Sequence, residues 1–303
     1  MMKYPQIAEQ VFGRPWAILP EYYETMRGVV LARMNGGSPA DFEAARQGVE
    51  GRTAVDDGAP VWMPEGGRLL DGVAVLPACG VMSRRMNLFM HYSGGVSTEM
   101  LGNSIAGALE DDAVEGIVLD IDSPGGAVNG SFSLAESVYQ ARGRKPIVAL
   151  ANGLAASAAY LLASAADAVL VNEAGDVGSV GVILTHVDFS KANEMDGVKP
   201  TYIYRGHYKA MGNQDEPLDK ESREYLQGIV DEAYTLFVDK VALYRGLSPA
   251  AVMGTEARTF MGVSAVKLGL ADGIGELADA VRMVKSEIKS RANIDNLKFK
   301  TIV

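Results

Sequence analysis

The sequence is poor in cysteine and histidine, residues on which redox and much acid–base chemistry depend. Its 303 residues include one cysteine, Cys79, and three histidines, His91, His186 and His207. One cysteine cannot form an internal disulfide, so a reducing compartment is expected, with Cys79 packed in a strand. A Ser-His-Asp triad is thinly supplied with histidine, and no metal or other cofactor is expected.

Long hydrophobic runs and an excess of positive charge are absent as well. No apolar run reaches 18 residues, and Met1–Gln10 has neither the basic start nor the apolar stretch of a signal peptide. The formal net charge of −10 argues against nucleic acid or an anionic membrane as a partner. With 48% apolar and 22% charged residues, the composition is typical of a globular protein, and we expect a cytosolic one.

Beyond residue 70, short apolar segments alternate with segments of helical periodicity. Strands are predicted over 73–77, 117–122, 147–150, 168–171, 178–184 and 199–205, and helices over 98–109, 132–142, 219–245 and 278–288. Strands that alternate with helices imply parallel βαβ crossovers, so the expected fold class is α/β.

The first 70 residues follow a different pattern. Helical spacing over 20–33 and a proline-containing helix start at Ser38 predict two helices, and residues 50–68, rich in Gly, Asp and Pro, predict a linker. No catalytic constellation is found here, so residues 1–70 are expected to be an N-terminal helical extension that serves as an assembly or docking arm. The polar and basic residues 286–303 predict a C-terminal tail that is frayed at its end.

Ser157 lies where a buried strand passes into a helix. The strand that begins at Pro146 ends near Asn152-Gly153, and small residues surround the serine: Ala155, Ala156, Ala158 and Ala159. Small neighbours allow another chain to approach the hydroxyl. A helix start presents unpaired N–H groups and the positive end of the helix dipole, which suit a developing negative charge. On this stretch alone, Ser157 is either a nucleophile or only a helix cap.

A glycine loop follows the strand that ends at Asp122. In Ser123-Pro124-Gly125-Gly126 the two glycines allow backbone N–H groups to face a ligand without an intervening Cβ. This loop is either a common turn or half of an oxyanion hole. The second donor would be the N–H of Ala158, next to the nucleophile.

A serine hydroxyl is a weak nucleophile without an adjacent base. The segment Tyr204–Gly212 offers two candidates, Lys209 and His207, while His186 is interpreted as a surface residue at a strand end. A lysine with the ordinary pKa of about 10.4 needs about 4.6 kcal/mol to be neutral at pH 7, and burial reduces this requirement. Residue types alone leave open whether Lys209 is a base or a solvated charge, and whether His207 acts instead.

Four motifs, in this order, resemble peptidase family S49, the signal peptide peptidase A family of Ser-Lys serine proteases, which is related in fold to the Clp protease subunit and to crotonases. They are Asp122–Gly126, Ala156–Asp167, Gly178–Val182 and Gly206–Lys209. The resemblance covers residues 71–285 and implies a Clp/crotonase-like spiral fold for this serine protease domain.

The resemblance also assigns roles. It implies that Ser157 is the nucleophile and Lys209 the general base, and that Gly125 or Gly126 supplies the oxyanion hole together with Ala158. Ser179 matches a position whose hydroxyl can hold the lysine amine. Two departures from the family pattern are Ala158-Ala159, where relatives often have Gly-Gly, and Tyr208, where histidine is frequent before the lysine.

Within the family, Pro5–Ala8 and Leu19–Tyr23 resemble the start of the lambda-type phage minor capsid proteins, which are procapsid proteases. This implies a homo-oligomeric ring with sites completed across subunits, so that Lys209 serves a neighbour's Ser157. It also implies phage scaffold, portal or capsid proteins as substrates in capsid maturation, in the host cytoplasm or the procapsid interior. Three alternatives stay open: a cytosolic housekeeping protease that degrades signal-peptide remnants, a crotonase-like acyl-CoA enzyme, and a non-catalytic capsid component.

Overall fold

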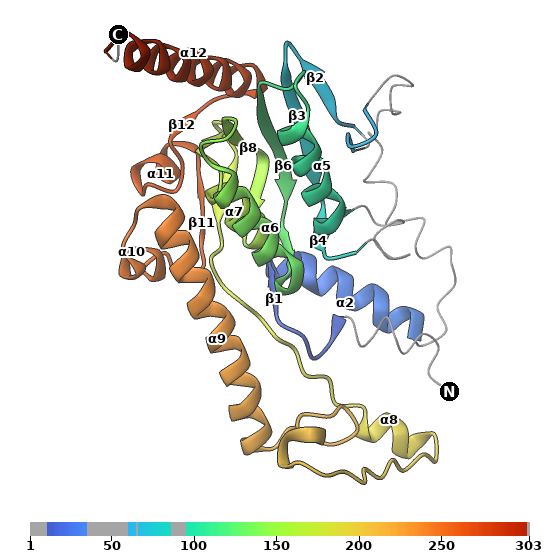
Figure 1. Ribbon diagram of the computed structural model, residues 1–303. Coiled ribbons are helices and arrows are strands. Elements are labelled where there is room, and N and C mark those ends of the chain that lie inside the picture. The colour runs from blue at the N-terminus through green and yellow to red at the C-terminus, as the bar shows by residue number, and fades with distance from the viewer. Residues whose placement is uncertain (1–10, 35–59, 65, 86–94, 302–303) are drawn as a thin grey trace.

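The computed structural model describes residues 11–34, 60–64, 66–85 and 95–301 (Figure 1). The helix predicted at Ser38, most of the predicted linker, Pro5–Ala8 and His91 lie outside these residues. A mixed sheet forms the centre of the described chain, and its strands run in the order β11-β10-β8-β6-β3-β2, with β9 beside β8 and β12 beside β9.

The bounds of these strands are β2 Arg68–Leu70, β3 Val73–Cys79, β6 Gly116–Ser123, β8 Ile147–Ala156, β9 Ala168–Val171, β10 Asp176–Gly178, β11 Thr259–Met261 and β12 Gly273–Ile274. The central strands β3, β6 and β8 are parallel and consist of nearly continuous apolar residues, because helices cover both faces of the sheet. The predicted α/β class with parallel βαβ units is confirmed. Cys79 ends β3 but is exposed, so the expectation that it is packed is wrong.

Helices form a layer on each face of this sheet. On one face lie α5 (Thr98–Glu110), α6 (Val128–Ala141) and α7 (Ala158–Ser164), which share the largest apolar core with the strands. On the other face lies α12 (Leu277–Thr301), whose Val284 packs against strand residues such as Val118. Residues 286–301 of the predicted C-terminal tail belong to α12, and the expectation that the tail is frayed at its end stays a prediction.

A second, smaller sheet has the order β1-β7-β4-β5. Its strands are β1 Trp16–Ile18, β4 Val81–Ser83, β5 Gly95–Ser97 and β7 Gly125–Ala127. Thus β1 and the following helix α2 (Pro20–Met34), both from the predicted extension 1–70, pack against the rest of the chain through a separate apolar cluster. The expected role of this extension in assembly stays a prediction.

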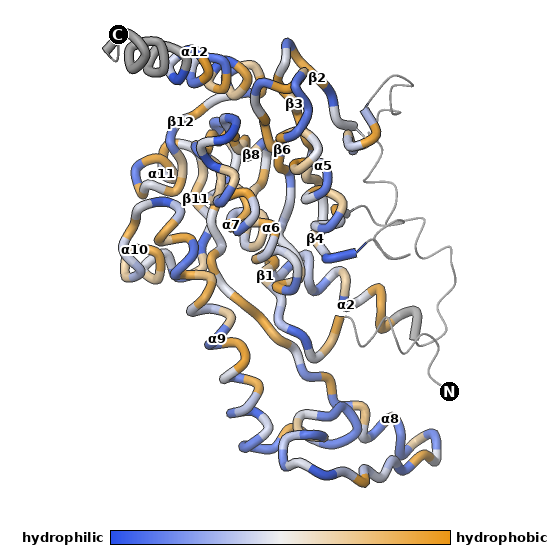
Figure 2. The backbone as a smooth tube through the Cα atoms, viewed as in Figure 1, coloured by the Kyte–Doolittle hydropathy of each residue, from blue (hydrophilic) through white to orange (hydrophobic). Residues whose placement is uncertain are grey.

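An arm, residues 184–219 with the first half of α9 (Lys220–Arg245), projects from the body (Figure 1). It carries α8 (Ser190–Met195) and the short helix η1 (His207–Ala210), while α10 (Pro249–Met253) and α11 (Gly262–Lys267) return the chain to the body. Hydrophilic residues are frequent in the arm, whereas the strands of the body are largely hydrophobic (Figure 2).

Two predicted strands are wrong. Residues 199–205 form no strand, and the strand expected over 178–184 is reduced to the end of β10 and an isolated bridge at Ile183. The strand-like residues in both segments have no continuous partner in the described chain, and a strand depends on its partner for its hydrogen bonds.

Candidate active site

Ser157 joins the end of β8 to the start of α7 in a strained conformation. Its side chain is fully buried, and its φ of 55° and ψ of −119° cost a residue with a Cβ on the order of 1–3 kcal/mol. Its amide donates to Gly178 O at 2.7 Å, and its carbonyl accepts from Leu161 N at 2.9 Å. A sharp turn of this kind between a strand and a helix presents a serine hydroxyl at the end of a sheet.

The Ser157 side chain does not act as a helix cap. It makes no capping hydrogen bond to α7, and its Oγ instead donates to the carbonyl of Gly181 at 3.4 Å. The alternative that Ser157 is only a cap is therefore wrong. The hydroxyl points across the end of the sheet toward the segment that follows β10.

The glycine loop lies directly against this turn. Gly125 has φ of +102°, and a Cβ on it would stand 2.9 Å from Ala156 O and 3.0 Å from Ala158 N. A Cβ on Gly126 would stand 2.0 Å from Met82 O, so neither position has room for a side chain. The structure thus brings Gly125 next to the first N–H of α7, while the amide of Gly125 itself donates to Ser123 Oγ at 3.2 Å. The interpretation of the loop as half of an oxyanion hole stays a prediction.

Ser179 belongs to the same neighbourhood. It is buried, has φ of 54°, and donates its amide to Arg258 O at 2.9 Å. Residues on both sides of it contact the candidate nucleophile, since Gly178 O accepts from the Ser157 amide and Gly181 O from its hydroxyl. Ser179 is therefore placed beside Ser157.

Lys209 is not brought to Ser157 within one chain. It is exposed on η1 in the arm, and its amide donates to Gly206 O at 3.0 Å. Figure 1 shows the arm at the lower end of the view, well separated from α7. Among the residues that the structure describes, no hydrogen bond or ion pair joins Lys209 to the Ser157 site.

The two described histidines also lie away from Ser157. His207 is exposed on η1, with its Nε2 2.7 Å from Glu221 Oε1. His186 is half-buried, with its Nε2 2.8 Å from Asn213 O, and lies in a segment without strand structure, not at a strand end as predicted. His207, like Lys209, thus lies apart from Ser157, because both residues belong to η1 in the arm.

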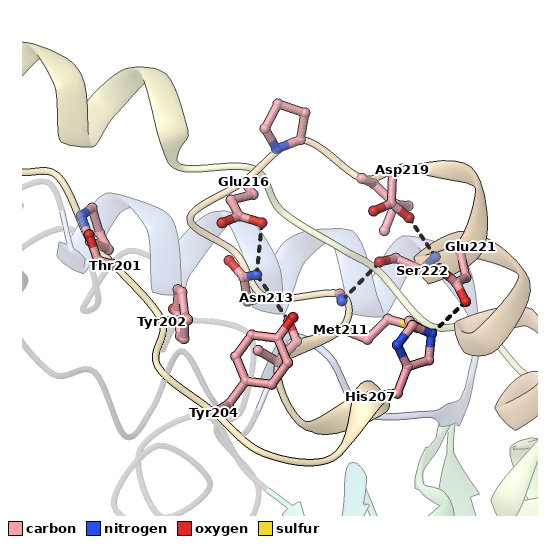
Figure 3. A pocket seen from close by; sticks show the side chains of 15 residues that line it. Thr201, Tyr202, Tyr204, His207, Met211, Asn213, Glu216, Asp219, Glu221 and Ser222 are labelled. Carbon is pink, nitrogen blue, oxygen red and sulfur yellow. Dashed lines mark hydrogen bonds and ion pairs between the residues drawn. The ribbon is translucent and has the colours of Figure 1, made fainter.

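The arm contains a cavity of about 420 Å³, whose lining includes Tyr202, Asn213, Glu216 and Ser222 (Figure 3). Tyr202 donates to Asp215, and this hydrogen bond raises the pKa of the tyrosine to about 12. Ser222 Oγ accepts from Gly212 N at 3.2 Å, which holds the loop after η1 on the first turn of α9. The polar contacts around the cavity therefore stabilise the arm, and the cavity is separate from Ser157.

Several residues that the sequence analysis did not single out hold α7 in place. Arg142 donates to the carbonyls of Ala165 and Ser164, at 2.9 and 2.8 Å, and so caps the C-terminal end of α7. From within α7, Tyr160 donates to Leu270 O at 2.9 Å, and burial raises the pKa of this tyrosine. The presence of Tyr160 in the motif after Ser157 is thus explained by its burial and by this hydrogen bond. Arg142 had no local signal, because its partners lie far along the chain.

An ion pair between a buried arginine, Arg245, and an aspartate whose side chain is 42% exposed, Asp272, supports the same region. Arg245 contacts both carboxylate oxygens of Asp272, at 2.8 and 2.9 Å, and Asp272 also accepts from Val169 N in β9. Burial by itself raises the pKa of Asp272, but the hydrogen bond from Arg245 lowers it overall. For Arg245, burial alone lowers the pKa, and the hydrogen bond to Asp272 raises it overall.

Comparisons with known protein families agree with this architecture. The model of peptidase family S49 matches residues 140–291, and that of the Clp protease family matches residues 84–171. The second match confirms the prediction of a Clp-like region in the fold.

Individual relatives include two phage proteins and a plant protein. The chain is 40% identical over 223 residues to the head-tail preconnector protein GP5 of Enterobacteria phage P21, which covers 74% of this chain and 44% of that protein. It is 33% identical over 292 residues to the capsid assembly protease C of Escherichia phage lambda, covering 95% and 66%. It is 31% identical over 241 residues to the chloroplastic serine protease SPPA of Arabidopsis thaliana, covering 78% and 35%.

The chain thus spans between 44% and 66% of the length of the two phage relatives. Across the described residues, no helix combines the length and the apolar character that a membrane crossing demands. The same residues contain no group of three or more His, Cys, Asp or Glu side chains placed to hold a metal ion.

Proposed function

The chain belongs to peptidase family S49, and we propose that it is a serine endopeptidase of phage or prophage capsid maturation that uses a Ser157–Lys209 dyad. The observation that carries the proposal is the strained turn at Ser157, with its hydroxyl directed out of α7 and the Gly125 loop against Ala158 N. A residue that served only to pack the core would not need this conformation. The names of the two phage relatives support a role in capsid assembly.

The proposed reaction proceeds through an acyl-enzyme. Neutral Lys209 accepts the proton of Ser157 while the serine oxygen attacks the peptide carbonyl, and the N–H groups of Ala158 and of Gly125 or Gly126 stabilise the oxyanion. The lysine ammonium then protonates the leaving amine, and water hydrolyses the ester. In this scheme Ser179 holds the lysine amine in position.

Lys209 reaches the site from a neighbouring subunit of a homo-oligomeric ring. Two features of the arm support this arrangement. Lys209 is exposed on a projecting segment, and large apolar side chains of the same segment are also exposed, among them Ile203 at 97% and Met195 at 88%. Contact with a second copy would bury these side chains and remove water from around Lys209.

The substrates are scaffold, portal or other capsid-associated proteins, cleaved in the host cytoplasm or the procapsid interior. The resemblance of the N-terminal segment to phage procapsid proteases supports this assignment over a housekeeping peptidase. No residue set in the described chain favours the acyl-CoA alternative.

The test is covalent labelling with a fluorophosphonate probe. Wild type is expected to label, Ser157→Ala to lose labelling, and Lys209→Ala to lose most of it, whereas Lys199→Ala, an exposed lysine of the same arm, serves as the matched control and labels normally. Mixing Ser157→Ala with Lys209→Ala subunits is expected to restore labelling. The Lys209→Ala subunit supplies an intact Ser157, and the neighbouring Ser157→Ala subunit supplies an intact Lys209.

Three results would contradict parts of the proposal. If mixing restores nothing while each single variant is inactive, the lysine acts within its own chain. If His207→Ala loses labelling and Lys209→Ala does not, the assignment of Lys209 as the general base is wrong. Absence of labelling in every oligomeric state would indicate a non-catalytic capsid component.

A further inference from the structure

The strand β1 lies between two segments beside the Ser157 turn, and it is hydrogen-bonded along both of its edges; the space that it fills between them is called the groove below. On one edge it runs antiparallel to β7, with Ala17 opposite Gly126 and Ile18 opposite Gly125, and Leu19 N donates to Pro124 O at 3.0 Å. On the other edge Trp16 and Ile183 exchange two hydrogen bonds of 2.8 Å each.

These two edges are the segments that flank the candidate nucleophile. Gly125 and Gly126 are the proposed oxyanion loop, and the segment that reaches Ile183 includes Gly181, whose carbonyl accepts from Ser157 Oγ. An extended peptide that is added between two such edges gains main-chain hydrogen bonds on both sides, which is how peptide strands are commonly bound. The groove therefore has the form of a site for an extended peptide.

The register of β1 places one of its carbonyls at the reactive end of this groove. The position that a Cβ of Gly125 would take is 2.2 Å from Ala17 O and 3.0 Å from Ala158 N. The carbonyl of Ala17 and the N–H of Ala158 thus flank the same point beside the nucleophile. A substrate carbonyl must occupy this neighbourhood if Ala158 is to stabilise its oxyanion.

The side chains of β1 also specify what the groove accepts. Ala17 is fully buried in the main core, whereas Trp16 and Ile18 belong to the separate cluster that includes Val11 and Tyr23. The indole of Trp16 and the hydroxyl of Tyr23 both donate to Val11 O at 3.1 Å, which fixes the segment before β1. The groove therefore receives a small residue opposite Gly126 and holds its present occupant firmly.

We propose that this groove is the site for the substrate main chain, with a small residue at the position of Ala17, and that β1 fills it as a resident strand that a substrate must displace. This inference rests on the proposed function. It explains why Ser157 is fully buried although the turn that carries it is built to present a hydroxyl. The protease is latent while β1 is docked.

The first test is to expel the strand in the full-length protein with Ala17→Asp, because an unpaired carboxylate is not tolerated in the apolar core. Thr25→Asp, which adds the same charge at an exposed position of α2, is the matched control. The probe is a tripeptide diphenyl phosphonate with alanine at the reactive position. If β1 leaves the groove in only 1–10% of wild-type molecules, Ala17→Asp is expected to label about 10 to 100 times faster, and Thr25→Asp at the wild-type rate.

A peptide with the sequence of residues 11–20 provides the reciprocal experiment. Added to Ala17→Asp, it is expected to slow labelling back toward the wild-type rate, whereas the same peptide with aspartate at the alanine position has no effect. Should Ala17→Asp not fold, hydrogen exchange on the wild type replaces it. The amides of Trp16 and Leu19 are then expected to lose protection when Ser157 has reacted with the phosphonate.

Failure of this inference is distinguishable from failure of the proposed function. If wild type and Ala17→Asp label equally and Ser157→Ala does not label, the proposal that β1 is a resident strand is wrong, but the proposed protease function still holds. Protection of Trp16 and Leu19 that is unchanged by the phosphonate would overturn it as well. Release of the first 17 residues during incubation, seen by mass spectrometry, would show that β1 is a self-substrate and not a lasting occupant. Absence of labelling in every protein would instead contradict the proposed function.

Discussion

Gly125 and Gly143 both have a positive φ but differ in their surroundings. Comparing alanine substitutions at the two positions measures how much stability is lost when a Cβ is forced against neighbouring backbone atoms. Both have conformations that L side chains rarely adopt, at +102° and +87°. A Cβ at Gly143 would meet nothing within 4 Å, whereas a Cβ at Gly125 would stand 2.2 Å from Ala17 O and about 3 Å from two backbone atoms of the Ser157 turn. The stability lost in Gly143→Ala therefore measures the cost of the unfavourable backbone conformation alone.

The expected magnitudes follow from these contacts. An unfavourable φ costs on the order of 1–2 kcal/mol at either position. At Gly125 the crowded Cβ adds about 1–3 kcal/mol, because backbone atoms can yield only if the loop or the strand shifts. Gly125→Ala is therefore expected to be less stable than Gly143→Ala by about 1–3 kcal/mol. It should also label with a fluorophosphonate about 100 to 1,000 times more slowly if the loop shifts and one oxyanion donor is lost, whereas a shift of β1 alone would speed labelling.

Urea unfolding followed by circular dichroism gives the stability difference, provided that the three proteins unfold with the same m value. Labelling rates measured under native conditions give the effect on the site. The reasoning is refuted if the two alanine variants unfold at the same urea concentration, or if Gly125→Ala labels at the rate of Gly143→Ala. The first result would mean that β1 and the loop adjust without cost, and the second that Gly125 does not position the oxyanion donors.

Two further predictions concern stability. Asp272→Asn is expected to destabilise the protein by about 1–2 kcal/mol, because it removes the charged partner of the buried Arg245, although solvent reaches the aspartate and screens the pair. Adding Arg245→Met should recover part of that loss in urea unfolding, and a double variant as unstable as the sum of the single ones would contradict this. Hydrogen bonds from Gln140, Lys240 and Tyr244 lower the pKa of Glu136 from 4.5 to about 2, so its stabilising contribution is complete above pH 4.5 and is lost as the pH falls toward 2. Thermal unfolding of Glu136→Gln should therefore depend less on pH in that window, and an unchanged dependence would contradict the assignment.

Most of the α/β body could be predicted from the sequence, because its elements have strong local signals. The strand at residues 168–171 and the helix that begins at Thr98 coincide with the predicted starts, and the capping side chains of Ser97 and Asp219 explain two helix starts. The strand patterns at residues 178–184 and 199–205 do not produce full strands, because alternation alone does not provide a hydrogen-bonding partner.

The sequence by itself determined the local parts of the site: the strand-to-helix turn at Ser157 and the Gly125-Gly126 loop. Each depends on residue types within a few positions of one another, such as small side chains and glycines at a turn. Only the tertiary structure decided that β1 lies beside Ser157, that Lys209 stands apart on the arm, and that Arg142 caps α7. These arrangements depend on hydrogen bonds between segments distant in the chain, and a local pattern cannot specify which distant segment will supply the partner.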